Sequence, residues 1–505
     1  MSALDQFTAT VSQVTVEDAT SPSLEPAENH TSELPIAISE QSNGEPDSSD
    51  PADWTISHIR RAYQAHELSA TSLVEGLLAR IDNREAQVLG WVTLNPSALD
   101  QAVVCDSEIS KSPSDKPLLG IPLGIKDLVD VAGLPTTCGS RHNTSDPVTT
   151  ESSAITRLRE AGAIIMGKTT THEYAFGGTT PPTRNPWNLD TVPGGSSGGS
   201  GAVLGAGMVP GAIGTDTAGS VRIPASYCGV VGFMGSYGRV PTDSVAVLAW
   251  SLDHVGAMAR TVTDTAVMHS VIAGLPTPTL PIARALPQTV GVPHSVLEPM
   301  HPSVREAFNT ALDALRARGV QVVDVPWPDP ALLEAVGFIL MMAESAAYHA
   351  QRMHNPDLFD PQVAELLVSG ATVSAVDHLQ ALRVRTQIAK WFDDLLTETP
   401  FLLTPTLPCL PPPLGSDTFT PVDLGSETQP LAAAHTRFPL AANIAGSPAG
   451  SLPCGLRGGF PIGLHVMGRR GSDMGVLTVM AGIEEVLAQD SLWQPGTIAP
   501  LSGGN

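Results

Sequence analysis

The sequence predicts an α/β fold, and two patterns along the chain support this prediction. Apolar residues recur at helical spacing between residues 59 and 81, which fits two amphipathic helices with a break near residues 68–69. From Pro117 onward the pattern changes to short apolar runs separated by Gly and Pro, as expected for buried strands that alternate with helices. The length of 505 residues is enough for one large domain or about three ordinary ones.

Residues 1–52 differ in composition from the rest of the chain. They contain no Lys or Arg, ten Asp and Glu residues, and many Ser, Thr and Pro. Such a segment cannot bury enough apolar surface to offset the entropy of ordering, so we expect a disordered acidic N-terminal tail. It lacks the positive start and apolar core of a secretory signal, and it lacks the Arg content of an organelle transit peptide.

Charge and cysteine content exclude several classes of partner. A chain with a net charge of -24 lacks the excess of Lys and Arg that binding to nucleic acid or to an anionic membrane demands. No run of about 18 apolar residues is present in the sequence, so no membrane span is expected.

The five cysteines are dispersed without a Cys-x-x-Cys pair, which favours free thiols in a reducing cytoplasm. No His-Glu-x-x-His or comparable cluster occurs, so we expect neither a metal nor a cofactor.

Residues 193–240 form the stretch around which the chain is organised. Glycine and other small residues dominate it, and such residues allow the close backbone approach from which a tight site is built. Two serines stand out, Ser196 in Gly-Gly-Ser-Ser-Gly-Gly-Ser and Ser220 in Gly-Thr-Asp-Thr-Ala-Gly-Ser-Val-Arg, 24 residues apart (220 − 196).

Both segments resemble the signature region of the amidase signature family of serine hydrolases. Residues 120–137 look like the lysine block of that family, with Lys126, and residues 185–190 resemble the lead-in to its glycine-serine loop. Residues 251–256, 259–264 and 458–469 are also similar to family blocks. The resemblance covers residues 53–487 in order.

The resemblance implies a domain organisation. Residues 53–505 are expected to form one α/β/α catalytic domain around a mixed β-sheet, after the tail of residues 1–52. A helical region at about residues 278–400 is expected to cover the site. The resemblance also leaves a homodimer in the cytoplasm as the expected state.

Hydrolysis of an amide requires a nucleophile, a base, an acid for the departing amine and donors for the oxyanion. The resemblance implies that Ser220 is the nucleophile, Ser196 the bridging serine and Lys126 the base. A lysine can act as a base only when neutral, and burial beside Ile125 and Leu128 is expected to lower its pKa from about 10.4.

The resemblance assigns further roles around these three residues. It implies a cis peptide between Gly195 and Ser196, and Ala218 stands where the family more often has glycine. The expected oxyanion hole consists of the backbone N–H groups of Thr217, Ala218, Gly219 and Ser220. The residues expected to support the loops are Gly195, Ser197, Asp216 and Arg222.

A substrate pocket is expected near the helical region. Residues 331–352 read as one long, mostly buried helix. The candidates for lining the pocket are Tyr174, Phe338, Met341 and Met342. For the helical residues among them, membership of the ordinary core is the competing interpretation, because an apolar stripe at helical spacing usually packs inside the protein.

Two other motifs compete with this interpretation. Gly162, Gly167, Lys168 and Thr169 match the phosphate-loop pattern, but the residues between the glycines are Ala-Ile-Ile-Met, which read as a buried strand. Residues 194–198 match Gly-x-Ser-x-Gly, which would make Ser196 the nucleophile, with Asp253 or a later residue as acid and a histidine such as His435 or His465 as base. That motif must follow a strand, and the preceding residues hold two prolines instead.

The expected activity is hydrolysis of an amide-type C–N bond through an acyl-enzyme on Ser220. Few Lys and Arg lie near the recognisable blocks, which favours neutral amides, anilides or carbamates as small-molecule substrates, with ester hydrolysis as a side activity. Two alternatives stay open: the glutamine-hydrolysing A subunit of a tRNA-dependent amidotransferase, and a catalytically silent binding protein on the same fold.

Overall fold

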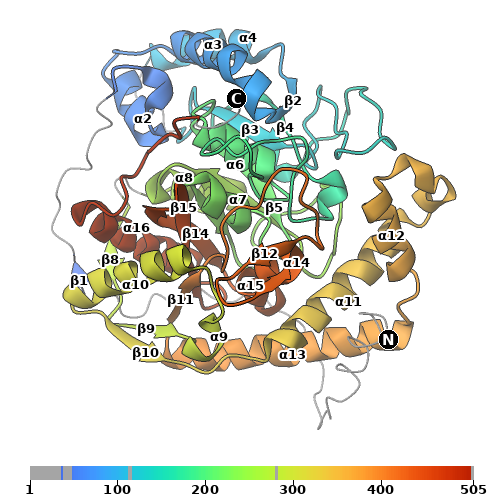
Figure 1. Cartoon of the computed structure of the whole chain (residues 1–505). Helices are drawn as coiled ribbons and strands as arrows, with labels where there is room; N and C mark the ends of the chain where they lie inside the picture. Colours follow the sequence, from blue (N-terminus) through green and yellow to red (C-terminus); the bar gives the residue numbers. More distant parts are fainter. Residues whose placement is uncertain (1–35, 38–47, 112–115, 279–281, 502–505) are drawn as a thin grey trace.

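A mixed sheet runs through the centre of the computed structural model, which describes residues 36–37, 48–111, 116–278 and 282–501 (Figure 1). The sheet has 11 strands in the order β10-β9-β11-β15-β14-β6-β7-β5-β3-β4-β2. Strand β3 is parallel to β4 and β5, and β9 is parallel to β10 and β11, whereas β5 is antiparallel to β7. The strands of this sheet are β2 (Trp91–Leu94), β3 (Pro122–Lys126), β4 (Ile164–Thr169), β5 (Gly211–Asp216), β6 (Val231–Met234), β7 (His254–Ala259), β9 (Thr289–Val292), β10 (Gln321–Asp324), β11 (Phe401–Pro405), β14 (Ala449–Arg457) and β15 (Phe460–Gly468).

Helices cover both faces of the sheet, which confirms the predicted α/β class. Two glycines of β15 show the two layers, because side chains at an odd separation along a strand point to opposite faces. A Cβ at Gly463 would meet Ser226, which lies in α7, and a Cβ at Gly468 would meet Val476, which lies in α16. One layer contains α6 (Gly198–Gly205) and α7 (Arg222–Cys228), and the other contains α8 (Val262–Ala273), α10 (Pro302–Ala317) and α16 (Asp473–Gln489).

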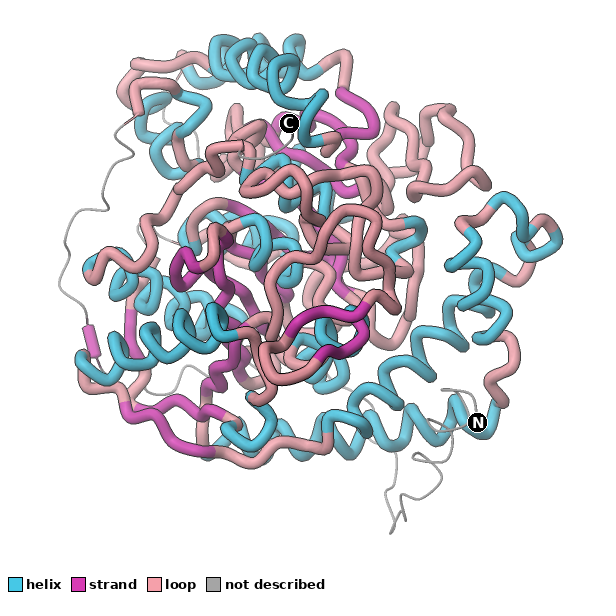
Figure 2. The backbone as a smooth tube through the Cα atoms, in the orientation of Figure 1, coloured by secondary structure: helices cyan, strands magenta, loops and turns pink. Residues whose placement is uncertain are grey.

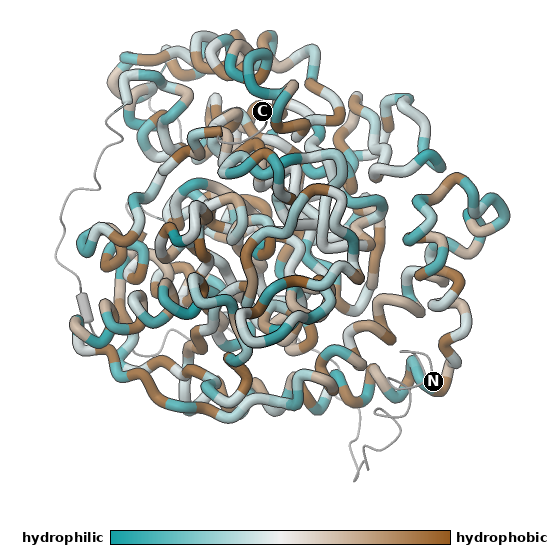
Figure 3. The backbone as a smooth tube through the Cα atoms, in the orientation of Figure 1, coloured by the Kyte–Doolittle hydropathy of each residue, from teal (hydrophilic) through white to brown (hydrophobic). Residues whose placement is uncertain are grey.

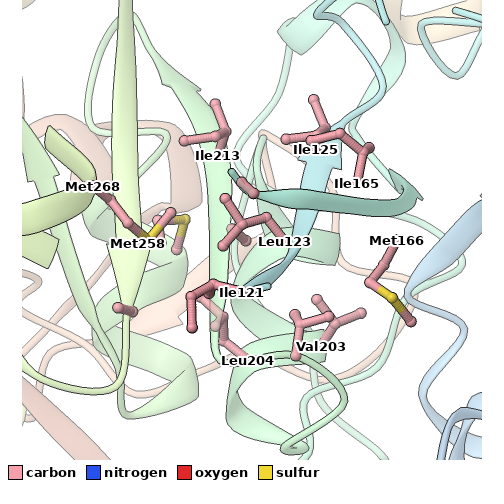
Figure 4. Packing of buried hydrophobic residues seen from close by; sticks show 14 of the residues in the cluster. Ile121, Leu123, Ile125, Ile165, Met166, Val203, Leu204, Ile213, Met258 and Met268 are labelled. Carbon is pink, nitrogen blue, oxygen red and sulfur yellow. The ribbon is translucent and has the colours of Figure 1, made fainter. Parts of the chain in front are cut away.

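The apolar core fills the space between the central strands and these helices. All residues of β3, β4 and β5 are buried, as expected for strands covered on both faces. Figure 4 shows Leu123, Ile125 and Ile213 of the strands packed near Leu204 of α6 and Met268 of α8. The site described below stands on this rigid part of the molecule.

The first two helices match the predicted pair. They are α2 (Ile56–Gln64) and α3 (Ala70–Val88), and Ser69 caps the start of α3 after the predicted break. They lie with α4 (Ala98–Ile109) at one end of the molecule, at the top of Figure 1. The Asp264 carboxylate accepts from the backbone N–H groups of Ile56 and Ser57, both at 2.9 Å, so it ties α2 to α8.

The predicted acidic tail falls mostly on residues 1–35 and 38–47, which lie outside the described residues. Between them, β1 (Ile36–Ala37) pairs antiparallel with β8 (Ala285–Leu286). Residues 48–52 belong to the folded part, because Asp50 forms an ion pair with Arg80 at 2.5 Å and Ala52 is buried in a short 3-10 helix, η1 (Pro51–Asp53).

The segment at about residues 278–400 is only partly helical, so the prediction of one helical region is wrong in its first third. Strands β8, β9 and β10 lie there, beside α9 (His294–Leu297) and α10 (Figure 2). The rest is helical, with α11 (Pro330–His349), η3 (Arg352–His354), η4 (Pro356–Leu358), α12 (Pro361–Gly370) and α13 (Ala375–Glu398). Hydrophilic and hydrophobic residues alternate along α10 and α13 in Figure 3, as expected for helices with one buried face.

Helix α11 is long and apolar enough to cross a membrane by length and composition, which the sequence analysis did not anticipate. It packs against α12, α13 and α15 (Pro439–Ala445), and 61% of its apolar window is buried inside the fold. The remaining elements are α5 (Ser153–Glu160), η2 (Glu173–Ala175), β12 (Pro421–Asp423), β13 (Thr428–Pro430) and α14 (Leu431–Thr436).

Candidate active site

The Lys126 side chain ends at the centre of the candidate site. Lys126 is the last residue of β3 and is completely buried. Its Nζ donates to Ser196 Oγ at 2.8 Å and to Thr215 Oγ1 at 2.7 Å. Because β3 and β5 are parallel, Lys126 and Thr215 reach the same carboxyl edge of the sheet, where ligands bind in open α/β sheets.

Burial changes the acidity of this amine. Removal from water lowers the pKa of Lys126 to about 7, although the negative charges of Asp216 and Asp253 oppose the shift. A lysine with this pKa is neutral in a large part of the population near pH 7. It can therefore accept a proton from a hydroxyl that contacts it.

Ser196 lies in a segment that the neighbouring backbone holds closely. The peptide between Gly195 and Ser196 is cis. A Cβ at Gly195 would lie 2.4 Å from the carbonyl oxygen of Thr179, so only glycine fits there. The next residue, Ser197, donates its backbone N–H to the carbonyl oxygen of Ser220 at 3.2 Å. The two serine-bearing segments therefore lie against each other.

The loop between β5 and α7 carries Ser220, and Asp216 organises it. The Asp216 carboxylate accepts from the backbone N–H of Gly219 at 2.8 Å and from that of Val221 at 3.1 Å. The Gly219 N–H is thus already used, which departs from its expected place in the oxyanion hole. The structure records no acceptor among its described residues for the N–H groups of Thr217, Ala218 and Ser220. Ala218 has no positive φ, so the alanine causes no backbone strain there.

Arg222 connects this loop to distant parts of the chain. Its guanidinium pairs with Asp216 at 2.9 Å, and both side chains are completely buried. It also donates to Asn443 Oδ1 at 2.6 Å and to the carbonyl oxygen of Pro439 at 2.8 Å, and it lies 2.8 Å from His465 Nε2. Although burial raises the pKa of Asp216, the charge of Arg222 and the hydrogen bonds from Arg222 and Asn443 lower it well below its usual value.

A cavity of about 150 Å³ lies beside this loop. Its wall is formed by Ala175, Thr215, Thr217, Thr242, Val245, Ala246, Val247, Leu248, Trp250, Asp253 and His254. The four residues expected to line a pocket do not line this cavity: Tyr174, Met341 and Met342 are buried in an apolar cluster, and Phe338 packs against that cluster. A separate pocket formed by them stays a prediction.

Two ionisable residues lie in the cavity wall, Asp253, which is partly buried, and His254, which is buried. Burial raises the pKa of Asp253 to about 6, although its hydrogen bonds from Thr217 Oγ1 and from the N–H groups of Leu248 and Ala249 oppose the shift. Burial lowers the pKa of His254 to about 4, so its imidazole is neutral at pH 7.

Comparison with known proteins places the chain in a family. The model of the family described as Amidase matches residues 72–477. The chain belongs to the amidase family. A protein named amidase from Pseudomonas putida is 38% identical over 418 residues, covering 79% of this chain and 89% of that protein. The A subunit of the glutamyl-tRNA(Gln) amidotransferase of Desulforapulum autotrophicum is 34% identical over 486 residues, covering 86% of this chain and 97% of that protein.

Solved structures agree with this family assignment. A crystal structure described as an amidase superposes with a TM-score of 0.80 at 32% identity, covering 87% of this chain and 100% of that one. The mixed sheet with helices on both faces is therefore the fold of the amidase signature enzymes, as the sequence blocks suggested.

The two competing motifs have structural roles in this amidase-family protein. Residues 164–169 form strand β4, so the phosphate-loop interpretation is wrong. Lys168 is instead buried in an ion pair with Asp127 at 3.0 Å. The histidines of the elbow interpretation bond elsewhere, His465 beside Arg222 and His435 at 3.0 Å from the Tyr227 hydroxyl.

Three residues of this amidase-family site escaped the sequence analysis. Thr215 contacts the lysine amine, Asn443 donates to Asp216 at 2.9 Å, and His254 lines the cavity. Thr215 lies one residue before Asp216 in the signature loop, so its place was a usable signal. Asn443 carried none, because it comes from a helix more than 200 residues away. In the described ranges, no group of three or more His, Cys, Asp or Glu side chains could hold a metal ion.

Proposed function

We propose that this protein hydrolyses neutral amide-type C–N bonds through an acyl-enzyme on Ser220. The observation that carries the proposal is the buried Lys126 amine, with a pKa lowered to about 7, which donates to Ser196 Oγ at 2.8 Å. Membership of the amidase family supports amide hydrolysis as the class of reaction. Anilides, carbamates and simple esters present the same carbonyl chemistry and belong to the proposed range.

The proposed reaction begins with two proton transfers. The Ser220 hydroxyl gives its proton to Ser196 Oγ while Ser196 gives its own proton to the neutral Nζ of Lys126. Ser220 Oγ attacks the carbonyl carbon as its proton leaves, and the carbonyl oxygen takes the negative charge. The N–H groups of Thr217, Ala218 and Ser220, which have no recorded acceptor among the described residues, are available to that oxyanion.

The return of the proton completes the cycle. Lys126 passes it back through Ser196 to the leaving nitrogen, so the C–N bond breaks and ammonia or an amine departs. A water molecule then gives its proton to the same pair of residues and attacks the ester carbonyl of the acyl-enzyme. The carboxylic acid leaves and Ser220 regains its proton. No metal or cofactor takes part in the proposed cycle.

One observation favours a second candidate function. The relative that is 34% identical over 86% of the chain is the A subunit of an amidotransferase, and its name ties it to glutamyl-tRNA(Gln). Glutamine as an ammonia donor would require a positively charged side chain to pair with its carboxylate. The described cavity has no Lys or Arg in its wall, which favours the neutral amide. A silent binding protein is the third candidate, and the proton-relay geometry speaks against it.

A panel of substrates tests the proposal. Ammonia or amine release is measured with the purified chain from benzamide, acetanilide, phenyl carbamate and glutamine, and phenol release is measured from phenyl acetate. We expect turnover of at least one neutral substrate, and a loss of roughly 10³-fold or more in kcat for Ser220→Ala and for Lys126→Met. Ser270→Ala is the matched control, because Ser270 is equally buried in α8 but lies outside the relay.

The same proteins are treated with a fluorophosphonate probe, which labels an activated serine. Labelling of the wild type and of Ser270→Ala, together with no labelling of Ser220→Ala, is the expected pattern. Hydrolysis of glutamine alone would favour the amidotransferase candidate. Absence of both labelling and turnover would leave the silent binding protein as the correct interpretation.

A further inference from the structure

The cavity beside the loop of Ser220 has a size that limits its occupant. Its volume of about 150 Å³ equals that of an engineered protein cavity that binds benzene, at about 150 Å³. A single six-membered ring fits within such a space, whereas a fused ring system or a long alkyl chain would have to extend beyond it.

None of Lys126, Ser196 and Ser220 lines this cavity, but two residues close to them do. Its wall includes Thr215, whose hydroxyl accepts from Lys126 Nζ at 2.7 Å. Thr217, three residues before Ser220, also lines it. A substrate whose carbonyl lies at Ser220 can therefore extend its acyl group into the cavity. With a primary amide the leaving group is ammonia, so the acyl group is the organic part of the substrate that needs a pocket.

The charge of the wall excludes acyl groups that carry a carboxylate. No Lys or Arg lines the cavity, and the ionisable groups in its wall are Asp253 and His254. Both oxygens of Asp253 already accept hydrogen bonds, from Thr217 Oγ1 at 2.6 Å and from the Leu248 N–H at 2.9 Å. A second carboxylate there would be buried without a counterion and beside a group of the same sign, which is unfavourable.

His254 presents the feature that selects for a hydrogen-bond donor. Its Nδ1 lies 2.7 Å from the carbonyl oxygen of Leu252, so Nδ1 carries the proton and Nε2 is an acceptor. The side chain is only 4% exposed, and Nε2 has no hydrogen-bond partner among the described residues. A buried acceptor without a donor is unfavourable, and a donor on a bound molecule would remove that cost.

We infer that the cavity holds an uncharged acyl group no larger than one six-membered ring, and that His254 Nε2 accepts a hydrogen bond from a hydroxyl or amino group on it. The inference rests on the proposed function and narrows it from neutral amides to one substrate class, small hydroxylated or aminated arenecarboxamides and their saturated analogues.

The size limit is tested with primary amides of increasing acyl group: acetamide, isobutyramide, benzamide, 2-naphthamide and dodecanamide. We expect kcat/KM to increase from acetamide through isobutyramide to benzamide. For 2-naphthamide and dodecanamide it should be about tenfold or more lower than for benzamide. Leu248→Ala enlarges the cavity and is expected to restore the turnover of 2-naphthamide. Leu379→Ala is the matched control, because Leu379 is 60% exposed on α13. Equal or better turnover of dodecanamide by the wild type would overturn the size limit.

The donor preference is tested with benzamide against 3-hydroxybenzamide and 3-aminobenzamide. The wild type is expected to prefer the substituted amides by about tenfold in kcat/KM, since one hydrogen bond to a buried acceptor is worth about 1.4 kcal/mol. His254→Phe keeps a ring against Tyr237, whose ring lies 5.5 Å away. It is expected to bring the ratio of kcat/KM for the substituted amides over that for benzamide, measured within the variant, close to one. A preference that survives in His254→Phe, or that is absent from the wild type, contradicts the role of His254.

Binding without turnover separates this inference from the proposed chemistry. Calorimetric titration of Ser220→Ala with 3-hydroxybenzamide is expected to show one site, and Ala246→Trp in the same background is expected to remove it by filling the cavity. If this pattern holds while no amide is hydrolysed by the wild type, the cavity assignment stands and the proposed function fails. If Ser220→Ala binds nothing, the cavity assignment fails whatever the wild type hydrolyses.

Discussion

Lys126 shows how burial changes the acidity of a single side chain. The sequence placed Lys126 and Ser196 together through their motifs, and burial beside Ile125 was a sound reason to expect a lowered pKa. Thr215 and His254 lie within sequence blocks that the resemblance covers, but their roles were not identified. A threonine and a histidine become part of a site through the strands that carry them, here β5 and β7.

The pH dependence of kcat/KM follows from the acidity of Lys126. Burial lowers the pKa of Lys126 to about 7, and only the neutral amine can accept the proton of Ser196. We expect kcat/KM to rise about tenfold for each pH unit below pH 7 and to level off above it, because this parameter reports the free enzyme. Lys390→Met, at an exposed site on α13, should leave the profile unchanged. A profile that is flat from pH 5 to pH 8 would contradict Lys126 as the base.

Thr215 is expected to position the lysine amine. Its hydroxyl accepts from Lys126 Nζ at 2.7 Å, so Thr215→Val removes one of the two acceptors that hold the amine. A hydrogen bond to the charged form stabilises that form, so its loss should lower the pKa of Lys126 further. We expect kcat to fall roughly tenfold and the acid limb of kcat/KM to move to lower pH. Thr215→Ser keeps the hydroxyl and should restore both kcat and the position of the acid limb. If Thr215 acted only through the packing of its methyl group, Thr215→Ser would restore neither.

At the scale of elements, the β5–α7 loop depends on one glycine for its shape. Gly219 has φ of 114°, and a Cβ there would lie 2.7 Å from the Cβ of Pro439. The sequence indicated a tight loop through its glycines. It did not indicate which glycine meets α15, because that neighbour comes from far along the chain.

Gly219→Ala is expected to displace the loop that carries Ser220. Both the positive φ and the contact with Pro439 oppose a side chain there, so kcat should fall about tenfold or more while the protein remains folded. Gly238→Ala is the matched control, since Gly238 also has a positive φ, of 75°, but a Cβ at this position would have no heavy atom within 4 Å. Circular dichroism and kcat are measured for both variants. If Gly219→Ala and Gly238→Ala lost similar amounts of activity, the loss would come from backbone strain in general and not from the contact with Pro439.

Element prediction succeeded where a pattern was long and failed where it was short. The helices α2 and α3 carry several turns of apolar periodicity, and both were predicted with their break. Strands β9 and β10 have four residues each, and they lie in a segment whose other residues favour helix. Such short strands form because a sheet edge is available to pair with them, and the sequence does not contain that information.

At the scale of the whole molecule, buried acids join layers that are distant in sequence. Glu484 of α16 accepts from the Val262 N–H at the start of α8 at 2.9 Å, and Asp264 of α8 holds the start of α2. Burial and the charge of Asp264 raise the pKa of Glu484 to about 8 from 4.5. The family resemblance predicted a mixed sheet, but the order of its strands, like these contacts, could not be read from the sequence.

Stability is expected to fall with rising pH because of Glu484. Between pH 4.5 and pH 8 the folded state keeps a proton that the unfolded state releases, so the free energy of unfolding decreases across this range. Glu484→Gln removes this dependence while keeping an acceptor for Val262. We expect the difference in the free energy of unfolding between Glu484→Gln and the wild type, measured by urea unfolding, to grow in favour of the variant. The growth between pH 5 and pH 8 should be on the order of 3 kcal/mol. Glu365→Gln, at an exposed site, should show no such growth, and a constant difference for Glu484→Gln would contradict the prediction.

The contacts of Arg222 also determine when the protein can first act. This side chain bonds to residues 217, 221 and 243 positions later in the chain, at Pro439, Asn443 and His465. During synthesis the loop that carries Ser220 is therefore made well before the residues that Arg222 bonds to. Until α15 and β15 have been made and have docked, the loop is held by Asp216 but lacks the contacts that Arg222 makes with these two elements.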